Sequence, residues 1–215
     1  VERALLVSIY FNEKDLPETR AMLEELDDLV SNLDIQVVGK ELVRSREIHA
    51  KFLCGTGKAQ EICDLAHSLD VDCVVFDNML APSQQREWER LIDVCVIDRE
   101  EVILDIFAQR ARTREATLQV DLARMQYSLP RMARMWAHLD RQGGGSGGGK
   151  GGSGAARGEG EKQIEVDRRL ARSRIEAIQK ELEDVRRQRA TQRKDRERQG
   201  MPTAAIVGYT NAGKS

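Results

Sequence analysis

The chain has 215 residues, of which 40% are hydrophobic, 33% charged and only 4% aromatic. The formal net charge of −2 argues against attraction of the whole protein to nucleic acid, but it leaves room for a locally basic surface. No segment approaches the roughly 20 apolar residues that span a bilayer, so we expect a cytoplasmic protein without stable membrane insertion. The four cysteines form no CxxC pair, and we expect them to be core residues in a reducing compartment.

Residues 1–112 alternate between short apolar runs and amphipathic stretches. The apolar runs with the pattern of strands are Ala4–Phe11, Ile35–Val43, Asp72–Asp77 and Cys95–Ile97, with a shorter run at Phe52–Cys54. The segments with helical spacing are Pro17–Val30, 57–69, Pro82–Ile92 and Glu100–Arg112. Alternation of this kind predicts an α/β domain with a mostly parallel sheet.

Residues 113–200 have a different pattern, in which apolar residues recur at alternating spacings of three and four. The first series is Leu118, Leu122, Met125, Leu129, Met132, Trp136 and Leu139, and the second is Ala171, Ile175, Ile178, Leu182 and Val185. Two heptad segments joined by a loop predict a long antiparallel two-helix hairpin that resembles a coiled coil. Pro130 lies inside the first series, where we expect it to kink the helix.

The two heptad segments are separated by a glycine-rich stretch at 143–160, which contains 11 glycines. This composition predicts a flexible loop without regular structure. An engineered linker is an alternative interpretation of the same stretch. Lys150 and Arg157 are unusual residues for a designed spacer.

The last residues form a short apolar strand that leads into a phosphate-binding motif, so residues 201–215 are interpreted as the start of a P-loop domain. The motif consists of Gly208, Tyr209, Thr210, Asn211, Ala212, Gly213, Lys214 and Ser215. Its glycines allow backbone N–H groups to face a polyphosphate. Lys214 is placed to reach the β- and γ-phosphates, and the Ser215 hydroxyl to bind Mg²⁺. A glycine-rich turn that matches by chance is the alternative.

No catalytic residue is assigned, because the switch segments and the base-reading motif of such a domain would follow Ser215. We therefore expect this chain alone to be inactive towards nucleotide. The motif does not distinguish GTP from ATP.

Four parts of the chain contain residue combinations that are specific when taken together. They are Asp98-Arg99 with Ile103–Ala116, Leu118–Ala123 with Leu129-Pro130-Arg131 and Trp136–Gln142, Arg157–Arg169, and Gly208–Ser215. In combination they resemble the HflX family of translational GTPases, and the resemblance extends over essentially the whole chain.

The resemblance implies a GTPase that uses Mg²⁺ and acts as a monomer on the large ribosomal subunit, in splitting or rescue of ribosomes or in translation under stress. It also implies that the loop between the two helices reaches ribosomal RNA near the peptidyl-transferase region, where Lys150 and Arg157 would contact phosphates. The segment Glu161–Gln199 has 13 basic and 9 acidic residues, which suits either a solvated face or an RNA site. Two other functions remain open, a coiled-coil interaction module with a vestigial phosphate loop and a P-loop ATPase unrelated to ribosomes.

Overall fold

The computed structural model describes residues 2–132, 155–200, 204, 207 and 208. A four-stranded sheet forms the centre of the N-terminal part, with strands β1 (Arg3–Tyr10), β2 (Gln36–Arg44), β3 (Cys73–Phe76) and β4 (Cys95–Asp98). The strands lie in the order β2-β1-β3-β4, and every neighbouring pair is parallel. The prediction of an α/β fold with a mostly parallel sheet is confirmed.

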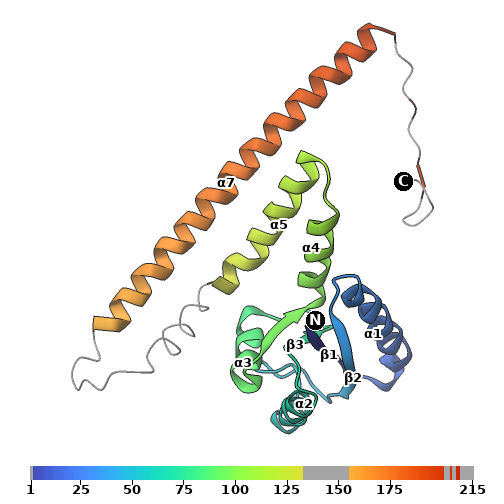
Figure 1. Cartoon of the computed structure of the whole chain (residues 1–215), viewed down its shortest axis with the longest axis vertical. Helices are drawn as coiled ribbons and strands as arrows, with labels where there is room; N and C mark the ends of the chain where they lie inside the picture. The colour runs from blue at the N-terminus through green and yellow to red at the C-terminus, as the bar shows by residue number, and fades with distance from the viewer. Residues whose placement is uncertain (1, 133–154, 201–203, 205–206, 209–215) are drawn as a thin grey trace.

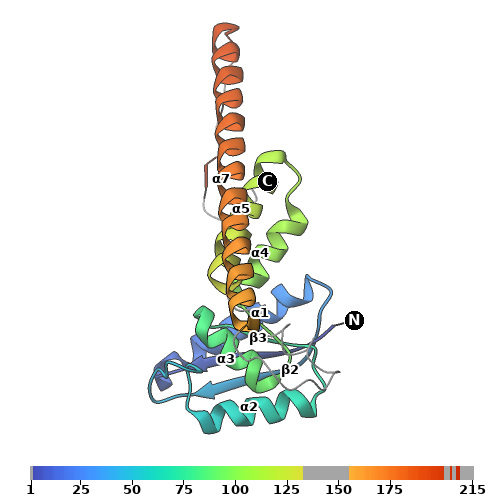
Figure 2. The same ribbon diagram turned by 90° about the vertical axis from the view of Figure 1, so that its left-hand side faces the viewer.

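Helices cover both faces of this sheet (Figures 1 and 2). They are α1 (Leu16–Ser31), preceded by the short 3-10 helix η1 (Glu13–Asp15), then α2 (Thr56–Ser68), α3 (Pro82–Ile92) and α4 (Arg99–Arg110). Strand β1 lies between two other strands, and its six middle residues are buried. Its nearly continuous apolar sequence is therefore explained by burial on both faces.

Alternate side chains of β1 point into two separate hydrophobic cores. Leu5 and Val7 belong to the core that contains residues of α2 and α3. Ala4 and Leu6 belong to the core that contains residues of α1 and α4. This division follows directly from the two-residue period of a strand.

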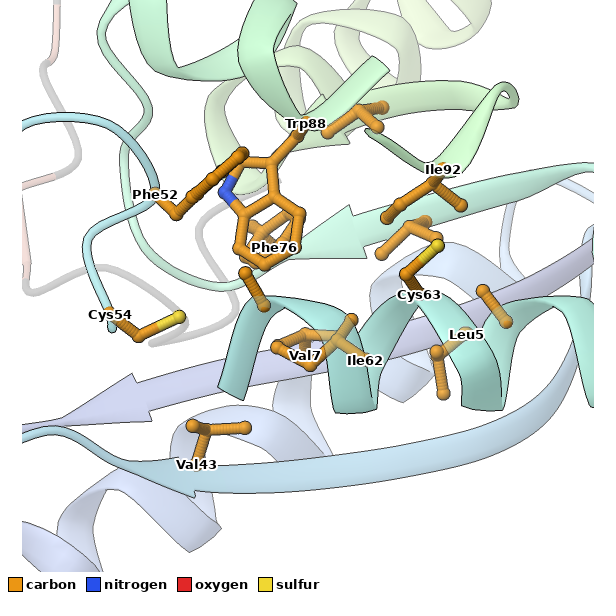
Figure 3. Close-up of a cluster of buried hydrophobic side chains, with 14 of the residues drawn as sticks. Leu5, Val7, Val43, Phe52, Cys54, Ile62, Cys63, Phe76, Trp88 and Ile92 are labelled. Atoms are coloured by element: carbon orange, nitrogen blue, oxygen red, sulfur yellow. The ribbon is translucent and has the colours of Figure 1, made fainter. Parts of the chain in front are cut away.

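Trp88 is the largest fully buried side chain, and it organises the first core (Figure 3). Its ring centroid lies 4.8 Å from that of Phe76 and 5.0 Å from that of Phe52. The apolar run Phe52–Cys54 thus supplies core side chains, but it adds no strand to the sheet. It forms only the isolated antiparallel bridges His49–Leu53 and Phe52–Cys54.

The cysteines follow the predicted core pattern with one exception. Cys54, Cys63 and Cys73 are buried, whereas Cys95 is exposed. The expectation that all four are core residues was therefore wrong for Cys95. It lies on β4, which is an edge strand and has a neighbouring strand on one side only.

Two long helices follow the sheet, α5 (Arg114–Met132) and α7 (Ala155–Arg198), and they lie side by side (Figures 1 and 2). On α7, the predicted apolar positions Ala171, Ile178 and Leu182 are buried. Ion pairs join Arg114 to Glu181 and Glu115 to Arg189.

Pro130 lies inside α5, which continues through it to Met132. The predicted heptad positions Trp136 and Leu139 lie outside the described residues.

The prediction that the whole stretch 143–160 lacks regular structure was wrong for its last part. Helix α7 begins at Ala155 and includes Gly158 and Gly160. A glycine inside a helix costs only about 1 kcal/mol relative to alanine, and the neighbouring Ala, Arg and Glu residues favour helix. Residues 143–154 lie outside the described part of the chain.

Candidate functional site

The predicted phosphate-binding residues are represented in the structure by Gly208 alone. Tyr209, Thr210, Asn211, Ala212, Gly213, Lys214 and Ser215 lie outside the described residues, as does Lys150. Arg157 was predicted in a loop, but it lies in the first turn of α7. The described residues therefore bring none of these predicted site residues together.

A polar cluster does lie in the described part, at the carboxyl-terminal edge of the sheet. The neighbours of β1 are β2 on one side and β3 on the other, so the strand order reverses between β1 and β3. In open α/β sheets, the carboxyl-terminal edge beside such a reversal is the usual ligand position. Here it holds Asp77, which follows β3 and accepts hydrogen bonds from Ser8 Oγ (3.1 Å) and Arg99 Nε (2.7 Å).

Arg99 connects this edge of the sheet to α1. Its Nη1 lies 3.2 Å from Glu25 Oε2, and its Nη2 donates a hydrogen bond to the Met22 carbonyl oxygen. The side chains of Arg99 and Asp77 are only 15% and 10% exposed. The largely buried Arg99 guanidinium thus connects β3 and α1 at this edge of the sheet, which indicates a structural role for the cluster.

Asp98, at the end of β4, is the second centre of the cluster. Asp98 is 1% exposed, and its side chain caps α4 by accepting a hydrogen bond from the Glu101 N–H. It also accepts hydrogen bonds from the Leu80 N–H (3.0 Å) and from the Tyr127 hydroxyl (2.6 Å). These donors come from three different parts of the chain, so the Asp98 side chain holds them together at the end of β4.

Arg131 completes this arrangement from α5. Its Nη2 lies 3.4 Å from Asp98 Oδ2 and donates a hydrogen bond to the Leu80 carbonyl oxygen (2.8 Å). Its Nε donates to Gln85 Oε1 (2.8 Å) on α3, and its guanidinium carbon lies 3.5 Å from the centre of the Tyr127 ring. Tyr127 and Arg131 therefore attach α5 to the end of the sheet. We call Asp98, Tyr127 and Arg131 the joint.

Burial raises the pKa of one group beside the joint, Glu101, and of one group within it, Tyr127. Burial, followed by the nearby carboxylates of Asp98 and Asp105, raises the pKa of Glu101 to about 7. Burial and the hydrogen bond to Asp98 raise the pKa of Tyr127 well above its usual range. Glu101 Oε2 is buried without a hydrogen-bond partner among the described residues, beside a hollow of about 220 Å³ between α4 and α5.

Comparisons with known proteins identify the chain. Residues 20–108 match the family described as "GTP-binding GTPase N-terminal", and residues 110–196 match "GTP-binding GTPase Middle Region". The "GTPase HflX" of Akkermansia muciniphila is 79% identical over 215 residues, which are all of this chain and 49% of that relative. The chain belongs to the HflX family.

Other HflX relatives are similar over the same region. The "GTPase HflX" of Escherichia coli K12 is 45% identical over 215 residues, which are 100% of this chain and 48% of the relative. The chain thus spans about half the length of the curated HflX proteins that it matches. The two matched regions are separated only by residue 109, near the end of α4. The boundary between the family regions thus lies where the sheet domain ends and the long helices follow.

Solved structures share this HflX fold at low sequence identity. A crystal structure of SsGBP with GDP matches with a TM-score of 0.59 and 20% identity, covering 89% of this chain and 46% of that one. A GTP-binding protein from Sulfolobus solfataricus in complex with GDP matches with a TM-score of 0.53 and 19% identity, covering 86% and 46%. None of the helices in the described parts of the chain combines the length and the apolar composition that a transmembrane helix requires.

Asp98, Arg99 and Arg131 lie in the segments that carry the HflX resemblance, but the sequence alone predicted no site role for them. One local signal was available, because an Asp between an apolar strand and a helix is typical of an N-cap. The contact between Asp98 and Arg131 carried no local signal, since 33 residues separate them.

Proposed function

We propose that the whole protein is a GTP-binding and GTP-hydrolysing protein that acts on the large ribosomal subunit, in ribosome splitting or rescue. The observation that carries the proposal is the 79% identity over the entire chain to a protein named GTPase HflX. The motif Gly208–Ser215 supports it, because its residues have the order that a P-loop GTPase requires.

In this proposal, residues 208–215 hold the nucleotide and no catalytic residue lies within the present chain. Lys214 provides a cation for the β- and γ-phosphates, and the Ser215 hydroxyl is a hard oxygen donor of the kind that Mg²⁺ prefers. Bound Mg²⁺ would neutralise charge on the phosphates. Residues 1–112 form an α/β domain, 113–200 an arm, and 201–215 the start of the GTPase domain.

The arm is proposed to be an antiparallel hairpin of α5 and α7. Supporting this arrangement, the first turn of α5 forms ion pairs with Glu181 and Arg189 in the second half of α7. Its tip would contain the residues between the helices and the first turn of α7, and so would carry Lys150 and Arg157. These cations are proposed to contact phosphates of ribosomal RNA near the peptidyl-transferase region.

Sedimentation of the full-length protein with purified ribosomal subunits tests the function. We expect the parent protein to co-sediment with the large subunit in a manner that depends on GTP or a non-hydrolysable analogue, and to hydrolyse GTP. Lys214→Ala should abolish nucleotide binding or hydrolysis while the N-terminal domain stays folded. Lys180→Ala, which removes an exposed cation on α7, should behave like the parent.

A parent protein that binds GTP but sediments free of ribosomal subunits in every nucleotide state would remove the ribosomal part of the proposal. A Lys214→Ala variant with parental GTP turnover would remove the assignment of the phosphate loop.

A further inference from the structure

Helix α7 is much longer than its partner α5, and its C-terminal end extends beyond it (Figure 1). Arg114 and Glu115, the first two residues of α5, form ion pairs with Glu181 and Arg189. Beyond Arg189, α7 continues to Arg198. This last part of α7 is exposed throughout.

The surface of α7 that faces α5 is apolar along the paired part and becomes basic near the first turn of α5. Along the paired part, this surface presents the buried residues Ala171, Ile178 and Leu182. Counted from Leu182, steps of four, three, four and three residues lead to four exposed arginines, Arg186, Arg189, Arg193 and Arg196. Residues at these spacings share one side of a helix. We call these four residues the arginine row.

The arginine row lies in a strongly basic segment. Residues 186–198 contain six Arg and one Lys against Asp195 and Glu197, which is a net charge of +5. Since the whole chain carries −2, the remaining residues together carry −7. The positive charge is therefore concentrated on one end of one helix.

Most of the arginine row is not neutralised within the described part of the protein. Arg189 pairs with Glu115 at 2.5 Å. Arg196 donates a hydrogen bond from Nε to the Gln192 carbonyl oxygen and has no carboxylate partner among the described residues. Arg186 and Arg193 likewise form no ion pair there.

We propose that the arginine row binds phosphate groups of an RNA backbone. The row extends over about 15 Å from Arg186 to Arg196, at 1.5 Å per residue, which is long enough to meet successive phosphates. Arginine presents a planar set of donors that fits phosphate with two hydrogen bonds, and it is more weakly hydrated than lysine.

An acidic protein surface fits the segment less well than RNA does. Protein interfaces depend on buried apolar or aromatic anchors, and the one apolar residue in 186–198 is Ala190. RNA binding needs no such anchor, because phosphate contacts supply most of the affinity. The inference rests on the proposed function for the source of the RNA. It adds a contact at the C-terminal end of α7, whereas Arg157 lies in the first turn of that helix.

The test compares two triple variants of the full-length protein that remove equal charge. The row variant is Arg186→Gln, Arg193→Gln and Arg196→Gln, which leaves the ion pair of Arg189 intact. The control is Arg172→Gln, Arg174→Gln and Lys180→Gln, three exposed cations on the paired part of α7 without an ion pair among the described residues. Glutamine has a helix propensity close to that of Arg and Lys, so circular dichroism should show equal helix content.

Binding of a labelled RNA hairpin is measured between about 50 and 200 mM salt, a range over which phosphate contacts lose much affinity. Each phosphate contact contributes about 0.7–0.9 to the slope of log affinity against log salt, so the row variant should lose about 2–3 from the parental slope. The control should keep the slope, and a variant with Lys at the three row positions should keep it as well.

The inference is overturned if the row variant keeps the parental slope, or if both triple variants lose it equally, because the effect then reflects overall charge. A row variant with parental RNA binding but a lower Tm would place the arginines on an acidic surface of the protein itself, which also overturns it. If the parent binds neither RNA nor large subunits, the proposed function is overturned together with this inference. If the parent binds large subunits and the row variant matches it, this inference alone fails.

Discussion

Arg131 on α5 and Asp98 at the end of β4 form an ion pair across 33 residues of sequence, with Arg131 Nη2 3.4 Å from Asp98 Oδ2. The Asp98 side chain is 1% exposed and that of Arg131 is 16% exposed. This pair connects the sheet to the first helix of the arm. The orientation of the arm therefore depends on groups that are largely removed from water.

Replacing Arg131 with Met should destabilise the protein strongly. The substitution keeps an apolar stem but leaves the buried Asp98 carboxylate without its ion partner, which typically costs about 3–5 kcal/mol. Urea unfolding followed by circular dichroism measures the change. Arg124→Met removes the exposed ion pair of Arg124 with Asp105 and should cost less than about 1 kcal/mol. Equal losses in the two variants would show that the joint has no special energetic role.

Tyr127→Phe should destabilise the protein by about 1–2 kcal/mol, because it removes a 2.6 Å hydrogen bond to a charged acceptor. Combined with Arg131→Met, the loss should differ from the sum of the two single losses, since both residues contact Asp98. A strictly additive double-mutant cycle would contradict the description of the joint as one unit.

Glu101 should make the stability of the protein fall as pH rises. Its pKa is raised from the ordinary value of 4.5 to about 7, so the folded state binds more protons than the unfolded state between these values. The stabilising contribution is complete below pH 4.5 and is lost as pH passes through about 7. Glu101→Gln should reduce this slope and raise Tm above pH 7 relative to the parent.

The matched control for Glu101 is Glu100→Gln on the same helix, since Glu100 is exposed. Its Tm should follow that of the parent over the whole pH range. If Glu101→Gln shows the parental pH dependence, the buried carboxyl is not the group that titrates.

Reversing the ion pair between Glu115 and Arg189 should test the side-by-side packing of α5 and α7. Glu115→Arg and Arg189→Glu should each lower Tm, and the double variant should recover part of the loss. The coupling energy should be about 0.5–1 kcal/mol, because Arg189 is 55% exposed and solvent screens the pair. If Glu115 and Arg189 show no coupling energy at low salt, the two helices do not pack side by side in solution.

Replacing Lys150 and Arg157 with Ala in the full-length protein should weaken binding to large ribosomal subunits. The slope of log affinity against log salt should fall by about 1.4–1.8, since two phosphate contacts are lost. GTP hydrolysis without ribosomes should stay at the parental rate. If a protein lacking residues 143–154 splits ribosomes as well as the parent does, the loop is only a linker.

Much of the fold could be predicted because it depends on local sequence pattern. The apolar runs at Asp72–Asp77 and Cys95–Ile97 predicted β3 and β4, and heptad spacing indicated the positions that are buried on α7. The start of α7 at Ala155 was missed because composition alone suggested coil, whereas isolated glycines can be accommodated in a long helix.

The joint could not be predicted, because its contacts depend on tertiary arrangement. Tyr127 and Arg131 have ordinary helical spacing, and their sequence does not reveal that this side of α5 meets the end of β4. The same reason explains Cys95, whose exposure depends on the position of β4 at the edge of the sheet.

The position of β1 in the middle of the sheet has a consequence for the order of folding. Although β1 is made first, Ala4 pairs with Cys73, and β3 must be available before β1 has both neighbours. Every strand pair is parallel, so local hairpins cannot start the sheet, and long loops have to close first. During synthesis, the apolar β1 segment should therefore stay accessible to chaperones until about a third of the present chain has emerged, and folding from denaturant should be slow for a domain of this size.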